Sequence, residues 1–104
     1  MVAAALFVVF LTSCFINTPA TLYLVNNSSR SIDQLYTRKV GTSDLIEEMH
    51  YSMIAEPGET QTINLVQSGH VDILITFEGE SGLVMVEEGA RIPSGGFYTV
   101  TVTD

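Results

Sequence analysis

The residues of this chain that could act as acids, bases or metal ligands are few and widely spaced. His50 and His70 are the only histidines, which is too few for a three-histidine zinc site. Glu47 and His50 stand three positions apart, a spacing that lets a helix turn both side chains toward one metal ion, but such a site needs a second helix with the same step. No Gly-x-Ser-x-Gly sequence is present to expose a serine nucleophile. We therefore expect no enzymatic activity and interpret both histidines as surface residues.

An acidic, glycine-containing segment offers carboxylates for a hard cation. Glu78 and Glu80 flank a glycine shortly after Asp72, and calcium requires several oxygen ligands of this kind. Their spacing matches no calcium-binding loop, so our main interpretation is a solvated turn. A weak divalent-cation site formed by Asp72, Glu78 and Glu80 remains the alternative, and we expect no cofactor.

Cys14 is the only cysteine, and it follows an uncharged apolar segment, residues 2–10. The four residues Leu11-Thr12-Ser13-Cys14 place an aliphatic residue and two small residues before the thiol. This arrangement resembles the lipobox of bacterial lipoprotein precursors. The resemblance implies that residues 1–13 are a signal peptide and that Cys14 carries lipid. The segment departs from the usual signal peptide in having no Lys or Arg before its apolar part.

Other interpretations of the apolar segment depend on its length. About ten apolar residues are far fewer than the roughly 20 that a membrane-spanning helix needs, so we do not expect such a helix. A buried strand or helix of the folded domain stays open as an alternative. So does a secretory signal cut after Ala20, which Pro19 disfavours because it directly precedes that residue.

The lipobox resemblance also implies a place in the cell. Residues 14–20 become a short tether, and six extended residues span at most about 20 Å, so the folded body lies close to the membrane. Phe15 occupies the position at which Asp retains lipoproteins at the inner membrane. We therefore expect a lipid-anchored protein of the bacterial cell envelope, with the outer membrane facing the periplasm favoured over the inner membrane in a Gram-negative cell.

The charge of the chain limits its partners. Twelve acidic and four basic residues give a net charge of −8. Nucleic acids and anionic lipid heads are bound by clustered Lys and Arg, and the only adjacent basic pair is Arg38-Lys39. We therefore expect no nucleic-acid partner and contact with the membrane only through the lipid on Cys14.

The rest of the chain, residues 21–104, has the pattern of one all-β domain. Short runs rich in β-branched and aromatic residues alternate with turn residues, which predicts strands over residues 21–25, 31–38, 61–66, 71–77, 83–87 and 97–103. Ser43 and the acids that follow it predict one short helical turn at residues 44–48. The fold class expected is a single small antiparallel β-sandwich of six or seven strands, immunoglobulin-like or transthyretin-like. In the strand at 71–77, Val71, Ile73, Ile75 and Phe77 share the face expected to form the core.

Several segments of this domain also resemble small exported bacterial β-sandwich modules of unassigned function. They are Val25-Asn26-Asn27-Ser28, Ile32-Asp33-Gln34-Leu35-Tyr36, Glu56-Pro57-Gly58-Glu59 and Phe77-Glu78-Gly79. This resemblance supports the fold more than an activity. The anchor, the short tether and the missing catalytic set lead us to expect a non-enzymatic interaction module that docks to or supports another envelope protein. Its edge strands are the expected contact surface, since an unpaired strand can add a strand from a partner. The alternative function is a lipoprotein that binds a ligand or a divalent cation through its acidic loops.

Overall fold

The computed structural model describes residues 19–50 and 53–104, and these form a two-layer β structure. They contain no helix long and apolar enough to cross a membrane. The predicted signal peptide and Cys14 lie outside the described residues. The expectation of an all-β domain with seven strands is confirmed, and the strands are β1 (Ala20–Asn27), β2 (Ile32–Lys39), β3 (Leu45–Glu47), β4 (Thr60–Leu65), β5 (Gly69–Phe77), β6 (Val84–Ile92) and β7 (Phe97–Thr103).

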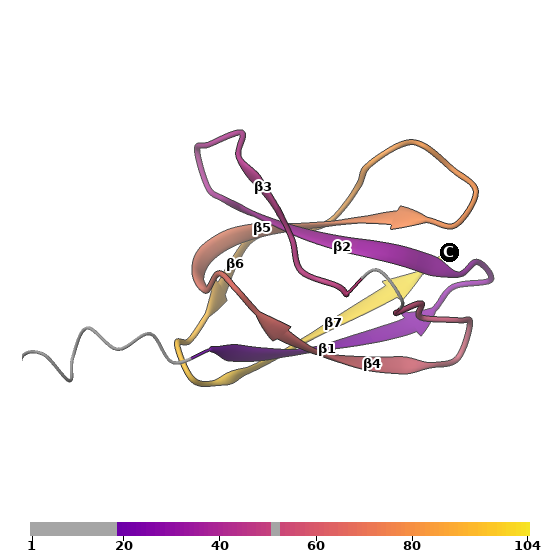
Figure 1. Ribbon diagram of the computed structural model, residues 1–104, viewed down its shortest axis with the longest axis horizontal. Coiled ribbons are helices and arrows are strands. Elements are labelled where there is room, and N and C mark those ends of the chain that lie inside the picture. The colour runs from indigo at the N-terminus through magenta and orange to yellow at the C-terminus, as the bar shows by residue number, and fades with distance from the viewer. Residues whose placement is uncertain (1–18, 51–52) are drawn as a thin grey trace, which may run out of the picture.

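The strands form two sheets, with the orders β4-β1-β7 and β3-β2-β5-β6, which lie as two layers in Figure 1. The neighbours β1 and β4 are antiparallel, as are all neighbours in the second sheet. The neighbours β1 and β7 pair in parallel. The prediction that the sandwich is entirely antiparallel is wrong for this one pair.

The strand order also distinguishes the fold from one kind of sandwich. Immunoglobulin constant domains place their first, second, fifth and fourth strands in one sheet and the third, sixth and seventh in the other. Here the first, fourth and seventh strands share a sheet. The order is therefore not that of an immunoglobulin constant domain.

The core lies between the sheets and follows the alternation expected of strands. Val71, Ile73, Ile75 and Phe77 of β5 are all buried, which confirms the face predicted from the sequence. Period-two alternation places these side chains on the same side of the sheet. They belong to one cluster with apolar residues of the other sheet, namely Ala20, Leu22, Leu24, Ile63, Leu65, Val100 and Val102.

The predicted helical turn at residues 44–48 is wrong, because residues 45–47 form the edge strand β3. This strand pairs antiparallel with β2, where Leu45 lies opposite Arg38 and Glu47 opposite Tyr36. The N–H of Glu48 then donates to the carbonyl of Leu35 at 2.8 Å. These bonds come from a distant part of the chain, and they outweigh the local preference for a helix.

The connection between β3 and β4 covers one open side of the sandwich, as it passes from one layer to the other (Figure 1). Of its described residues, Met49 and Ala55 are buried in the core and Met53 packs against it. The side-chain amide of Gln61 on β4 donates to the carbonyl of Ile54 at 2.9 Å. The gap between the sheet edges at β3 and β4 is therefore filled by apolar side chains of this connection.

One end of the β3–β4 connection is held by the buried carboxylate of Glu48. It accepts a hydrogen bond from the Thr37 hydroxyl at 2.5 Å and another from the Val66 N–H at 2.6 Å. The N–H of Gln67 donates to it at 3.3 Å, and the side-chain amide of Gln67 donates to Thr37 at 3.1 Å. Glu48 thus joins the chain after β3 to β2 and to the end of β4.

The other end of the connection is held by Asn26, whose side chain is fully buried. Its amide nitrogen donates to the carbonyls of Ala55 and Arg30, both at 2.8 Å. Its oxygen accepts from the N–H and the hydroxyl of Ser28, at 3.0 and 2.6 Å. All four hydrogen-bonding positions of the amide are used. The Asn-rich turn expected after the first strand thus also fixes the chain before β4.

Candidate functional site

The last strand, β7, has one free edge along its whole length. Within residues 19–50 and 53–104 it pairs only with β1, in unbroken register from Thr21 opposite Phe97 to Asn27 opposite Thr103. Residues 97–103 include no charged residue and no proline. An edge of this kind presents unpaired N–H and C=O groups to which another strand can bind.

The other sheet edges are protected in ways that β7 is not. The strand β3 has only three residues, and β4 lies beside the β3–β4 connection. The strand β6 pairs with β5 through two register shifts, and it carries Glu87, Glu88 and Arg91. Short length, bulges and charges are the usual devices that prevent edge-to-edge pairing. Among the described strands, β7 is therefore the long edge that lacks them.

One of the shifts in β6 depends on Gly89 and Asp72. Gly89 has φ +68°, and its N–H donates to the Asp72 carboxylate at 2.9 Å. A Cβ at this position would lie 3.2 Å from Nε2 of His70. A left-handed glycine is a common way to insert one extra residue into a strand. Asp72 therefore fixes the local geometry of β6.

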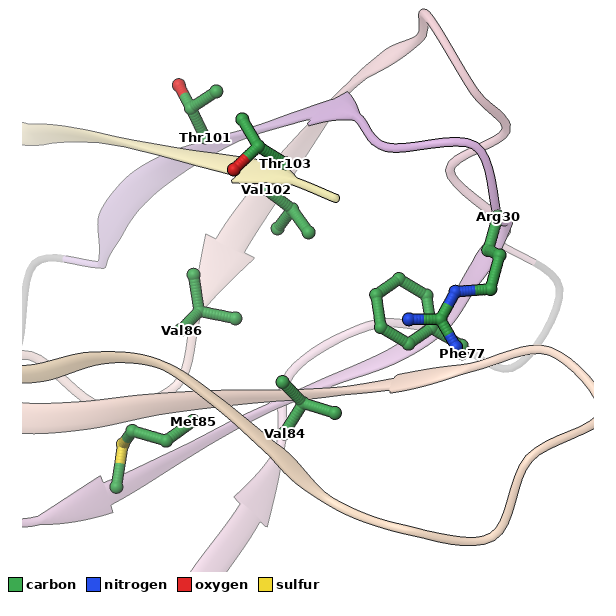
Figure 2. A pocket seen from close by; sticks show the side chains of 8 residues that line it. All are labelled: Arg30, Phe77, Val84, Met85, Val86, Thr101, Val102 and Thr103. Atoms are coloured by element: carbon green, nitrogen blue, oxygen red, sulfur yellow. The ribbon is translucent and has the colours of Figure 1, made fainter.

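A groove of about 290 Å³ lies between β6 and β7, on the side of the sandwich away from the β3–β4 connection. Figure 2 shows Val102 of β7 and Val84 and Val86 of β6 pointing into the same space, with the Phe77 ring beside them. Val84 is 41% exposed. These valines occupy alternate positions on their strands, so their side chains point toward the interior. Phe77 and Val102 are themselves buried, so the apolar side chains that reach solvent in the groove are Val84, Met85 and, in part, Val86. The full lining is Arg30, Phe77, Val84, Met85, Val86, Thr101, Val102 and Thr103.

Arg30 forms one wall of the groove, and it comes from the turn between β1 and β2. Its guanidinium lies 3.8 Å from the centroid of the Phe77 ring, close enough for a cation–π interaction. It also forms an ion pair with Glu80, and both side chains are half exposed. Arg30 thus extends the apolar wall with the flat face of a side chain whose charge is already paired.

Two further carboxylates belong to residues that follow the lining residues in the sequence, Glu87 after Val86 and Asp104 after Thr103. The Tyr98 hydroxyl donates to Glu87, which ties β7 to β6. Asp104 accepts from the N–H and the hydroxyl of Ser29, at 2.9 and 3.0 Å. The backbone N–H of Ser29 and then its hydroxyl lower the pKa of Asp104. Glu80, which is paired with Arg30, is a third carboxylate near the groove. Together these three carboxylates and the Arg30 guanidinium carry a net negative charge.

The residues predicted as a weak cation site are not brought together. Asp72 lies six positions before Glu78 along an extended strand, which separates their backbones by about 20 Å. The Gly89 N–H and then the side chain of Arg38 lower the pKa of Asp72, and Arg38 forms an ion pair with it at 3.0 Å. In the part of the chain that the structure describes, no three His, Cys, Asp or Glu residues lie close enough to hold a metal ion.

The groove has few side chains that could exchange protons. Its lining is apolar except for two threonines and Arg30, so among the described residues it presents no pair of acid and base. Glu47 and His50 are both exposed, near the end of β3, and they do not line the groove. Comparison of the chain with models of protein families, with curated protein sequences and with solved structures finds no match.

Proposed function

We propose that this protein is a membrane-anchored bacterial lipoprotein whose β-sandwich is a non-enzymatic interaction module. The module docks to, or supports, another protein of the cell envelope. The observation that carries the proposal is the free edge of β7 beside an open apolar groove. Strand addition at such an edge supplies main-chain hydrogen bonds, and pockets for alternate side chains supply specificity.

The position of the groove supports this role. The tether implied by Cys14 enters the fold at Ala20, which is fully buried and begins β1. At that end of the sheet Thr21 lies opposite Phe97, whereas the groove residues Thr101–Thr103 lie at the other end of β7. Five or six residues of strand separate the two ends by about 20 Å. A protein anchored through Cys14 therefore presents the groove on the side away from the attachment point.

The family of the sandwich is part of the same proposal. The sequence leaves two kinds of sandwich open, immunoglobulin-like and transthyretin-like. Because the observed strand order is not that of an immunoglobulin constant domain, it supports a transthyretin-like arrangement. In this order the chain's first strand pairs with its last, and β7 is left at the edge of its sheet. The open edge is then a consequence of the topology.

Site-specific photo-crosslinking in intact cells tests the proposal. A photoreactive amino acid replaces Thr101, which is exposed on β7, or Leu45, which is exposed on the far edge of the other sheet. The same two positions are tested in a Cys14→Ser background. We expect one discrete adduct from position 101 that is lost with Cys14→Ser, and none from position 45. Identical adducts from both positions, or no adduct from position 101, would count against the proposal.

A further inference from the structure

The two open sides of the sandwich are filled in different ways. On the β3–β4 side, the chain's own connection inserts Met49 and Ala55 into the core and is held by buried hydrogen bonds from Asn26 and Glu48. On the β6–β7 side, the described residues include no such segment, and the groove remains. The first side shows what fills a gap of this kind in this fold, which is a segment of chain whose apolar side chains point inward.

The free edge of β7 indicates the conformation of a segment that could fill the groove. A strand beside β7 continues its sheet with the usual spacing of about 4.8 Å. Side chains of that strand next to Val102 would point inward, toward Val84, Val86 and Phe77. Those next to Thr101 and Thr103 would point outward, where β-branched residues pair well with threonine. The segment therefore alternates apolar residues with β-branched or polar residues.

The size of the groove limits what enters it. At about 290 Å³ it lies at the lower limit of the 300–1,000 Å³ typical of small-molecule sites. It is also open along β7, as expected for a site that a polymer crosses. One or two inward-facing apolar side chains of a strand are the occupants that match both the volume and the free edge.

Charge adds a further requirement. Glu80 is paired with the lining residue Arg30, and Glu87 and Asp104 directly follow the lining residues Val86 and Thr103. Arg30 is the only base among the lining residues, and the chain as a whole carries −8. An acidic segment would be repelled on approach, whereas a basic segment is attracted. The residues that flank the inserted side chains are therefore basic.

We infer that the groove receives an extended segment of the partner protein, in which inward-facing apolar residues alternate with β-branched or polar ones and Lys or Arg residues flank them. This inference rests on the proposed function and names the chemistry of the partner at the same site. The segment adds to β7 as an eighth strand and closes the β6–β7 side, much as the β3–β4 connection closes the other side.

Selection from a library of displayed random nonapeptides tests this inference on the purified full chain in detergent. We expect the enriched peptides to alternate apolar and β-branched or polar residues, to carry Lys or Arg near their ends and to lack acidic residues. Amide hydrogen exchange of the chain with an enriched synthetic peptide should show new protection in β7. Failure to enrich peptides, enrichment of acidic or non-alternating peptides, or no added protection in β7 would overturn the inference.

A pair of matched variants locates the binding. Val84→Arg adds a long charged side chain to the groove, and Leu45→Arg adds the same charge at an equally exposed position, since Val84 and Leu45 are 41% and 39% exposed. We expect Val84→Arg to weaken binding of the enriched peptide by about tenfold or more, and Leu45→Arg to change it less than about twofold. Circular dichroism checks that both variants fold, and Val84→Thr serves as a smaller change if Val84→Arg does not. Equal weakening by both arginine variants would overturn the inference.

Two other outcomes separate the inference from the proposed function. A chain that is dimeric in solution, and that Val84→Arg makes monomeric, would assign the groove to a second copy and overturn the inference. If crosslinking at position 101 captures an anchored partner while the selected peptides show neither alternation nor basic flanks, the inference fails and the proposed function stands. If position 101 gives no adduct in cells, the proposed function itself fails.

Discussion

Replacement of Glu48 tests the assignment of residues 45–48 most directly. In the structure its carboxylate accepts hydrogen bonds at 2.5 Å from Thr37 and 2.6 Å from Val66, and only 7% of the residue is exposed. The neighbouring Glu47 is exposed. If residues 44–48 formed the helical turn that the sequence suggests, no such difference between the two acids would be expected. The pair Glu48→Ala and Glu47→Ala therefore distinguishes the two arrangements.

The expected loss of stability in Glu48→Ala follows from the hydrogen-bond donors that this variant leaves without an acceptor. Glu48→Ala removes the acceptor for one hydroxyl and for the N–H groups of Val66 and Gln67. A buried donor left without an acceptor costs about 1–3 kcal/mol, and we expect a total loss of about 3 kcal/mol because Gln67 is partly exposed. A loss of about 3 kcal/mol lowers the melting temperature of a domain of this size by roughly 12–24 °C. Glu47→Ala should change the free energy of unfolding by less than about 0.5 kcal/mol.

A milder substitution tests the role of the negative charge. In Glu48→Gln one oxygen can still accept from Val66, but the new amide group faces the N–H of Gln67, and two donors then oppose each other. We expect a loss of about 1–2 kcal/mol. A double-mutant cycle with Thr37→Val should give a coupling energy of about 1 kcal/mol, because the two side chains share a hydrogen bond.

Urea denaturation followed by circular dichroism and tyrosine fluorescence measures all these variants, since the chain has four tyrosines and no tryptophan. Equal effects of Glu48→Ala and Glu47→Ala would refute the reasoning, as would zero coupling between Glu48 and Thr37. If the dependence of the free energy of unfolding on urea concentration is the same in all variants, they differ in stability and not in the compactness of the folded or unfolded state.

Three further substitutions test other parts of the structure in the same denaturation assay. Asn26→Asp loses both amide donors and places a carboxylate beside two carbonyl oxygens, so it should lower the free energy of unfolding by about 3–5 kcal/mol. Asn27→Asp, at the exposed neighbouring position, should lower it by less than about 0.5 kcal/mol. Equal losses in the two variants would contradict the hydrogen-bond network of Asn26. Gly89→Ala should cost about 1–2 kcal/mol because its φ is +68°, whereas Gly82→Ala, with open space around it, should be close to neutral. The pKa of Asp72 is lowered in the folded state, so its contribution is complete above the unfolded value of about 3.9 and is lost as the pH falls through the folded value. Asp72→Asn should therefore flatten the decrease in stability at acid pH, and an unchanged pH profile would contradict this account.

The strands and the core could be predicted because their signals are local. The alternation of Val71, Ile73, Ile75 and Phe77 identified both a strand and its buried face, and β5 confirms both. The sequence Pro57-Gly58 is likewise typical of a tight turn, and a turn is present there, with Gly58 at φ +87°. In each case the residues within a few positions determine the outcome, so one sequence is sufficient.

Residues 44–48 show where local signals fail. Ser43 and the following acids suit a helix start, but Leu45 and Glu47 pair with β2 and Glu48 is buried against Thr37. The decisive contacts are made with residues about ten positions away and with the end of β4. A propensity of a few tenths of a kcal/mol per residue is a weak guide when such contacts compete with it.

The groove could not be predicted, because it depends on which strands become neighbours. Its lining comes from four separate segments that include Arg30, Phe77, Val84 and Thr101, and no spacing in the sequence relates them. One signal was available, since residues 97–103 form a strand with no charge and no proline in a strongly acidic chain. That signal marks an unprotected strand, but only the sheet order shows that β7 lies at an edge.

The distribution of buried polar groups supports the proposal that the groove is a site rather than a packing defect. Asn26 and Glu48 are buried polar side chains that hold the β3–β4 connection, and unsatisfied groups at these positions would cost several kcal/mol. The hydrogen bonds of these two side chains thus keep one side of the core closed. On the other side, β6 carries a bulge and acidic residues that disfavour its pairing with another strand, while β7 carries neither. In our proposal a partner strand binds at β7, the one long edge among the described strands that lacks these features. Its apolar side chains cover Val84 and Val86 and so bury apolar surface that the described residues leave exposed or partly exposed.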